Sequence, residues 1–154
     1  MMKEYSFQRH KIAGGIGADD EYWRYLEEGE LRIPKCRNCH GWTWPAHFRC
    51  GTCGSWEFEW CPLDVAGTIS GTISGTIYSW TRSWYAFDRV AERAEDLPYV
   101  TLLVEIEGAG GARLLGMLQG NEDALAVGMP VRGSILAPSE KTKGYPSLVW
   151  EMVS

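Results

Sequence analysis

Cys36-Arg-Asn-Cys39 and Cys50-Gly-Thr-Cys53 are two copies of one short pattern, separated by ten residues. In each copy two cysteines flank two other residues, so a tight turn can direct both sulfur atoms at one point. Two such turns facing each other surround one ion with four thiolates, the tetrahedral arrangement that Zn²⁺ accepts. The four cysteines therefore predict one structural zinc ion in a small ribbon.

The residues around the cysteines favour the same interpretation. The range 31–62 contains Pro34, Pro45, several glycines and few aliphatic residues, so it has little apolar surface for a core. A segment of about 30 residues with so small a core needs a cross-link in order to fold. Zinc supplies one, because the free energy of metal binding becomes free energy of folding.

Three other uses of these cysteines are open at this point. Cys36-Arg-Asn-Cys39-His40 also fits the CxxCH pattern of c-type haem attachment, which would leave the second pair unexplained. A rubredoxin-like iron site would use the same four sulfurs. A redox-active pair of the thioredoxin kind belongs at the start of a helix after a strand, where neither pair lies.

The fifth cysteine and two histidines lie outside this pattern. Cys61 is expected to be a small apolar residue where the ribbon joins the next unit, with a ligand or reactive role as the alternative. His40 and His47 could replace a cysteine, which four available sulfurs make unnecessary. Since four thiolates leave no position for water, the zinc is expected to be structural, and no catalytic residue is predicted.

Residues 1–30 are expected to form an arm followed by a short helix. The first 17 residues lack the apolar stretch of a secretory signal. Asp19 or Asp20 can cap the helix and Gly29 can end it. The apolar residues on one face are Tyr22, Trp23 and Leu26. A helix this short is not stable alone, so this face must pack against the chain or a partner.

Residues 63–154 are predicted to form a separate β unit. Gly-Thr-Ile occurs three times, at 67, 71 and 75, and Ile69, Ile73 and Ile77 share one parity in a long strand from Gly67 to Ser83. Gly71 and Gly75 mark places where this strand could bend or bulge. The other expected strands are Tyr99–Glu107, which is apolar enough to be covered on both faces, Arg113–Gln119, Val131–Ala137 and Ser147–Val153.

A helix is expected between the third and fourth of these strands, with Asn121 as its N-cap and Gly128 at its end. This order of elements is typical of a five-stranded Greek-key barrel of the OB type, with a short β-sandwich as the competitor. The predicted fold is therefore mainly β, with an N-terminal short helix (1–30), a zinc ribbon (31–62) and an OB-fold barrel (63–154).

The connection Trp84–Pro98 is longer than an ordinary hairpin loop and rich in aromatic residues. Phe87, Val90, Ala91 and Ala94 would form one face of a helix that closes an end of the barrel. The alternative, which we prefer, is a loop that contacts a partner or ligand. The candidate contacts with a protein partner or an anionic cofactor are Arg82, Trp84, Tyr85, Phe87 and Arg89.

Charge and hydropathy exclude several classes of function. The formal net charge is −5, which opposes nucleic-acid binding because phosphate neutralisation requires clustered lysine and arginine. No run of 18 apolar residues exists, so no membrane span is expected. Five cysteines as thiols or metal ligands suit the cytoplasm. The eight tryptophans are either core residues or contacts at an interface.

This arrangement resembles the DUF35 family of acyl-CoA-associated proteins, which combine a short helix, a rubredoxin-like zinc ribbon and an OB-fold. The resemblance covers about Asp20 to Val153. Beyond the cysteines, the similar segments are Gly75-Thr-Ile-Tyr-Ser-Trp-Thr81, Leu97-Pro-Tyr-Val100 and Gly128-Met-Pro-Val131. Two features depart from the family: the threefold Gly-Thr-Ile run, and His40 where glycine would ease a left-handed turn.

The resemblance implies a small subunit that pairs with a thiolase-fold large subunit, as two plus two chains, while the large subunit provides catalysis. Such pairs act as thiolases, acyltransferases or aldolases on CoA thioesters. Trp80–Asp88, with Gly14–Gly17, is most similar to small subunits of thiolases for aromatic acyl-CoA in toluene degradation. The functional alternatives are an aldolase subunit, an OB-fold module for single-stranded nucleic acid, and an iron–sulfur electron carrier.

Overall fold

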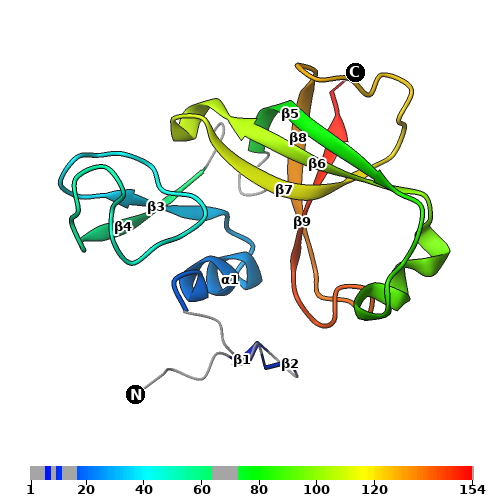
Figure 1. Ribbon diagram of the computed structural model, residues 1–154, viewed down its shortest axis with the longest axis horizontal. Coiled ribbons are helices and arrows are strands. Elements are labelled where there is room, and N and C mark those ends of the chain that lie inside the picture. Colours follow the sequence, from blue (N-terminus) through cyan, green and yellow to red (C-terminus); the bar gives the residue numbers. More distant parts are fainter. Residues whose placement is uncertain (1–5, 8–9, 12–16, 64–72, 154) are drawn as a thin grey trace.

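The computed structural model describes residues 6–7, 10–11, 17–63 and 73–153. It is mainly β, with a short helix, a ribbon that carries the cysteine cluster, and a closed five-stranded barrel of the OB type (Figure 1). The predicted fold class is therefore confirmed. The N-terminal arm adds a small antiparallel pair, β1 (Ser6–Phe7) and β2 (His10–Lys11).

Helix α1 (Asp20–Glu27) begins and ends close to the predicted positions. Asp19 is its N-cap, but the Asp19 carboxylate accepts a hydrogen bond from Trp23 Nε1, at 3.0 Å, instead of capping the backbone. Tyr22 and Leu26 are buried, as the helical spacing predicts. Gly29, with φ of 81°, follows the helix and its N–H donates to Leu26 O.

The ribbon consists of β3 (Arg32–Cys36) paired antiparallel with β4 (Phe58–Pro62). Ile33 lies opposite Cys61 and is fully buried. Cys36 is the last residue of β3, so the strand pair fixes the first metal-ligand candidate at the start of the turn that follows.

The barrel is built from β5 (Ile73–Ser83), β6 (Tyr99–Ile106), β7 (Ala112–Gln119), β8 (Pro130–Leu136) and β9 (Ser147–Met152). The strand order is β5-β6-β7-β9-β8, and β8 pairs with β5 to close the barrel. Only the pairing of β7 with β9 is parallel among these strands. This Greek-key order is that of an OB-fold.

Trp150 fills the barrel interior and is fully buried. A Cβ atom added to Gly116 on β7 would lie 2.6 Å from Trp150 Nε1, and one added to Gly133 on β8 would lie 2.7 Å from Trp150 Cζ3. The two glycines therefore leave the space that the indole ring occupies.

One buried core extends from the helix through the ribbon to the barrel. It includes Leu26 of α1, Ile33 of β3, Leu63 and the interior residues of the barrel. Trp42 of the ribbon also lies against the β6–β7 turn, 3.0 Å from the position of a Cβ atom on Gly110. The division of the chain after residues 30 and 62 stays a prediction.

The helix expected at residues 121–128 is absent. Asn121 Oδ1 instead accepts a hydrogen bond from the Asp123 N–H at 2.8 Å, and the Gly128 N–H donates to Ile77 O at 2.7 Å. Asparagine forms a similar side-chain bond in a turn and at a helix N-cap, so the sequence signal does not distinguish the two. The segment is a turn-rich loop fixed to β5.

Two expectations for individual strands were also wrong. In β6, buried and half-buried residues alternate, so only one face lies in the core. In β5 the register shift lies between Ile77 and Ser79 instead of at Gly75. At Gly75 the strand lies so close to β6 that a Cβ atom would be 2.4 Å from Val104 Cγ1. Ile73 and Ile77 are buried as predicted; Ile69, Gly71 and the rest of the first two Gly-Thr-Ile copies, except Ile73, lie outside the described residues.

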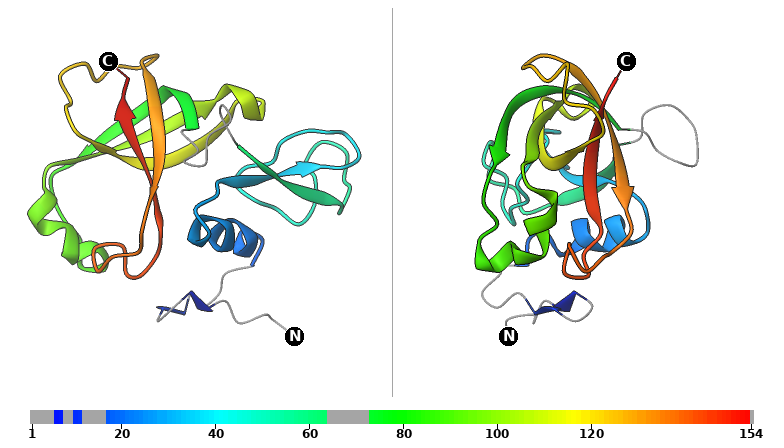
Figure 2. Two further views of the ribbon diagram at one scale, coloured as in Figure 1. Left: turned by 180° about the vertical axis from the view of Figure 1, so that it is seen from behind. Right: turned by 90° about the vertical axis from the view of Figure 1, so that its right-hand side faces the viewer.

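The connection from β5 to β6 contains a 3₁₀ segment, η1 (Asp88–Asp96), which is interrupted at Val90. It buries none of its residues, so the apolar helical face of Phe87, Val90, Ala91 and Ala94 does not cover the barrel. Figure 2 shows η1 and the loop before β9 at the same end of the barrel. Lys141 Nζ joins them through Asp96 Oδ1 at 2.5 Å.

None of the helices in the described part of the chain has the length and apolar character needed to cross a lipid bilayer.

Candidate metal centre

The two CxxC turns have matching backbone geometry. The Cys36 N–H donates to Gly41 O and the His40 N–H donates to Cys36 O, at 2.9 and 3.0 Å. In the second turn the Cys50 N–H donates to Ser55 O and the Gly54 N–H to Cys50 O, at 2.8 and 2.9 Å. The sequence repeat thus becomes a structural repeat that presents two sulfurs from each turn.

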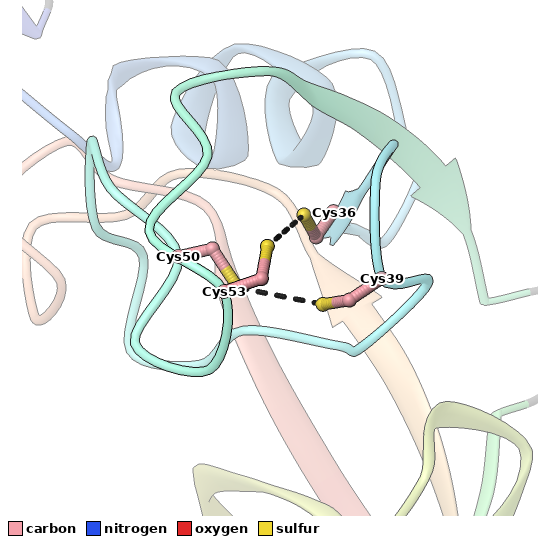
Figure 3. A group of neighbouring side chains, drawn as sticks. All are labelled: Cys36, Cys39, Cys50 and Cys53. Carbon is pink, nitrogen blue, oxygen red and sulfur yellow. Dashed lines mark hydrogen bonds between the residues drawn. The ribbon is translucent and has the colours of Figure 1, made fainter.

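The four sulfur atoms converge between the turns (Figure 3). Cys36 Sγ lies 3.6 Å from Cys53 Sγ, and Cys39 Sγ lies 3.6 Å from Cys50 Sγ. All four lie within 4.8 Å of one another. These separations are too long for disulfides, and a tetrahedron with Zn–S bonds of ~2.3 Å has edges of ~3.8 Å. The cluster therefore has the size of a tetrahedral metal site.

The thiols differ in acidity. A hydrogen bond from the Asn38 side chain, with a second from the Ser55 backbone, lowers the pKa of Cys53 to about 6. The backbone N–H of Cys53 is the main cause that lowers the pKa of Cys50. The Gly41 N–H lowers the pKa of Cys39, but the surrounding thiols and desolvation together raise it to about 11. Four thiolates in this space repel one another, so a divalent cation would stabilise the fully deprotonated set.

The remaining candidates lie apart from the sulfur cluster. Cys61 pairs with Ile33 across the ribbon strands and is half-buried, and desolvation raises the pKa of its thiol. His40 and His47 are exposed, and neither belongs to the group of ligand atoms that converges among the described residues. Cys36, Cys39, Cys50 and Cys53 can hold one metal ion.

The predicted partner-contact residues occupy the end of β5 and the connection after it. Trp84, Tyr85 and Phe87 are 72%, 63% and 70% exposed, and the rings of Tyr85 and Phe87 pack edge to face at 5.0 Å. Arg82 pairs with Glu122 at 2.5 Å and lies over the Trp80 ring, so it is engaged within the chain. Arg89 is exposed on η1.

Comparison with known proteins gives related folds. The family model of the ChsH2 C-terminal OB-fold domain matches residues 68–135. A chain of the solved "Ltp2-ChsH2(DUF35) aldolase" is 23% identical, with a TM-score of 0.66, over 88% of this chain and 94% of that chain. A DUF35 protein of unknown function from Sulfolobus solfataricus is 19% identical, with a TM-score of 0.54, over 88% and 85%. No curated protein matches.

These matches show a related fold. Most of the barrel is similar in sequence to the ChsH2 C-terminal OB-fold domain, and the two solved DUF35 structures are similar to the chain in fold.

Two features of the chain were not predicted. One is the hydrogen bond from Asn38 to Cys53, for which the position of asparagine inside the first CxxC is the only sequence signal. The other is a groove of about 430 Å³ between α1 and the barrel. Its lining comes from five segments distant in sequence, so no local pattern could reveal it.

Proposed function

We propose that this chain is the zinc-binding, non-catalytic small subunit of a heteromeric thiolase-type enzyme that acts on aromatic acyl-CoA thioesters. The observation that carries the proposal is the match, over 88% of the chain, to a chain of the Ltp2–ChsH2(DUF35) aldolase. The name of that aldolase joins two components, Ltp2 and ChsH2. The family resemblance adds a thiolase-fold large subunit in a two-plus-two heterotetramer in the cytoplasm.

Zinc would be held by Cys36, Cys39, Cys50 and Cys53 as four thiolates. A filled tetrahedron leaves no position for substrate or water, so the ion would act as a structural cross-link for the ribbon. The sulfur separations of 3.6 Å support this role. Catalytic groups would then belong to the large subunit.

The exposed aromatic segment supports contact with that subunit. Trp84, Tyr85 and Phe87 leave large apolar surfaces in solvent, and aromatic residues of this kind are enriched at the centres of protein interfaces. Arg89 lies on the adjoining segment η1 and could meet a CoA phosphate at the edge of such an interface. Arg82 would have to exchange its Glu122 partner to do the same.

The proposal of an aromatic substrate rests on the similarity of Trp80–Asp88 to the small subunit of benzoylsuccinyl-CoA thiolase, an enzyme of toluene degradation. An aldolase subunit is the second candidate, and the similarity to a chain of the Ltp2–ChsH2(DUF35) aldolase favours it. The two reactions differ in a measurable way. Thiolysis consumes free CoA, whereas aldol cleavage releases a carbonyl compound without consuming CoA.

A tagged full-length chain, purified from its native cell, tests the proposal. We expect a thiolase-fold protein to co-purify, and the pair to cleave an aromatic acyl-CoA only when free CoA is added. Cleavage without CoA would support the aldolase. A chain that purifies alone, beside a large subunit that is fully active without it, would contradict both.

Two double variants locate the interface. Trp84→Ser with Phe87→Ser is expected to weaken co-purification by at least about tenfold, since buried aromatic contacts dominate interfaces. Phe48→Ser with Trp56→Ser removes similar exposed aromatic area from the ribbon, where these residues are 51% and 70% exposed, and is expected to retain the partner. The opposite result would move the interface to the ribbon.

A further inference from the structure

A groove crosses the outer surface of the barrel beside helix α1, with a volume of about 430 Å³. Its walls come from α1, from η1, from β7 and from the loop that leads into β9. Figure 2 shows α1 beside the start of β9, next to the barrel end that carries η1. Sites for small molecules have volumes of about 300–1,000 Å³, so this groove is large enough for one.

One wall and the floor are apolar or aromatic. Trp23 packs edge to face against Tyr22 on one side and Tyr145 on the other, with ring centroids 5.1 and 5.3 Å apart. Leu115 of β7 lines the floor and is 64% exposed, an unusual exposure for leucine in a barrel strand. A flat or aliphatic group lying here would cover apolar surface that water now contacts.

Four other lining residues, the cationic wall, carry positive charge. Arg89, Arg93, Lys141 and Lys143 line the groove, and its lining includes no aspartate or glutamate. This separation of charge is notable because acidic residues outnumber basic ones, 20 to 15, in the whole chain. A groove with one sign of charge attracts the opposite charge in its ligand.

Carboxylates that do not line the groove pair with three of these cations. Asp96 accepts from Arg93 at 3.4 Å and from Lys141 at 2.5 Å, while Lys143 lies 3.8 Å from Glu92. Arg89 differs: within the part of the chain that the structure describes, no carboxylate lies within 4 Å of its guanidinium. Its donors are therefore available to a ligand.

We propose that this groove binds an amphipathic anion, with its apolar body against Trp23, Tyr145 and Leu115 and its carboxylate or phosphate at Arg89. The size of the groove and its division into an apolar floor and a cationic wall carry the proposal. A neutral apolar ligand would leave the cationic wall without a partner. An inorganic anion would leave the apolar floor in water.

This site shares Arg89 with the proposed function but requires no second subunit. It is therefore tested on the full-length, zinc-loaded chain alone. Failure of binding here would not affect co-purification with a large subunit, and failure of co-purification would not affect binding.

The test is a ¹⁵N–¹H NMR titration with three probes that share one apolar body: 6-phenylhexanoate, 6-phenylhexyl phosphate and 6-phenylhexan-1-ol. We expect one or both anions to bind with a Kd of about 1 mM or tighter, the scale that ~14 non-hydrogen atoms support. The shifted amides should be those of the groove, and the alcohol should bind at least about fivefold more weakly. The comparison of the two anions distinguishes a carboxylate ligand from a phosphate ligand.

Protein variants test separately the contact with the charged head of the ligand and the contact with its apolar body. Arg89→Gln should weaken the preferred anion about fivefold, the scale of an exposed charge pair, and leave the alcohol unchanged. Leu115→Asp should abolish binding of the anions. Arg132→Gln on β8, exposed and absent from the groove lining, is the matched control and should bind as the wild type does.

Equal affinity for the alcohol and both anions would overturn the proposal. Shifts confined to amides outside the groove would also overturn it. So would the absence of binding of every probe at about 10 mM, or an Arg89→Gln variant that binds the anions as tightly as the wild type.

Discussion

His40 and Gly54 occupy equivalent places in the two CxxC turns, directly after the second cysteine. Both adopt left-handed backbone conformations, with φ of 59° and 77°. Glycine accepts this conformation freely, whereas a residue with a Cβ atom is strained in it. The sequence alone indicated the difference, because the first turn has histidine where the second has glycine.

We predict that His40→Gly raises the free energy of unfolding by about 0.5–1 kcal/mol, the strain of a left-handed residue less the entropy that glycine loses on folding. Urea unfolding of the zinc-loaded protein measures it. His47→Gly is the matched control, because His47 is exposed and has no positive φ. It should be neutral or destabilising, and an equal gain in both variants would contradict the explanation.

The four clustered cysteines and Cys61 should respond differently to substitution. Cys50→Ser removes a buried sulfur from the cluster, and we expect it to lower metal affinity by more than about 100-fold, since a three-ligand site loses the closed tetrahedron. Cys61→Ser should retain one metal ion per chain. Metal content after gel filtration checks both, and loss of metal in the Cys61 variant would make Cys61 part of the site.

At the scale of elements, the barrel depends on how Trp150 fits between two strands. We predict that Gly133→Ala destabilises the chain by about 1–3 kcal/mol, because the added methyl would lie 2.7 Å from the indole and overpack the core. Gly108→Ala is the control, since nothing lies within 4 Å of its new Cβ atom. Thermal unfolding compares the two variants. Equal melting temperatures would show that the core rearranges to accommodate the added methyl group, which would contradict the prediction.

Elements with strong local signals were predictable, and those decided by tertiary contacts were not. The parity of Ile73 and Ile77 fixed the buried face of β5. The capping pattern at Asn121, by contrast, led to a helix that does not exist, because the same side-chain bond closes a turn. The bulge between Ile77 and Ser79 contains no glycine, so no local pattern marked it.

At the scale of the whole molecule, aromatic residues connect the three parts of the chain. On α1, Tyr22 packs against Trp44 of the ribbon at 4.5 Å, and Trp23 packs against Tyr145 of the barrel loop at 5.3 Å. Of the eight tryptophans, Trp150 is fully buried and five more pack against the core. Trp56 and Trp84 are 70% and 72% exposed. The predicted core use of tryptophan is therefore confirmed for six of the eight residues, and interface use stays a prediction for Trp56 and Trp84.

The metal is expected to stabilise the ribbon more than the barrel. The ribbon has two strands and the sulfur cluster, whereas the barrel has five strands closed around its own interior residues. A chelator should therefore unfold residues 32–62 first and leave most barrel amides protected, because local stability follows the density of buried contacts.

Metal analysis combined with hydrogen exchange tests the central claim most directly. We predict about one zinc ion per chain, and rapid exchange of the β3–β4 amides and of the His40 and Gly54 amides after chelation. A purified chain that contains no zinc, and whose ribbon amides stay equally protected with chelator present, would contradict the account.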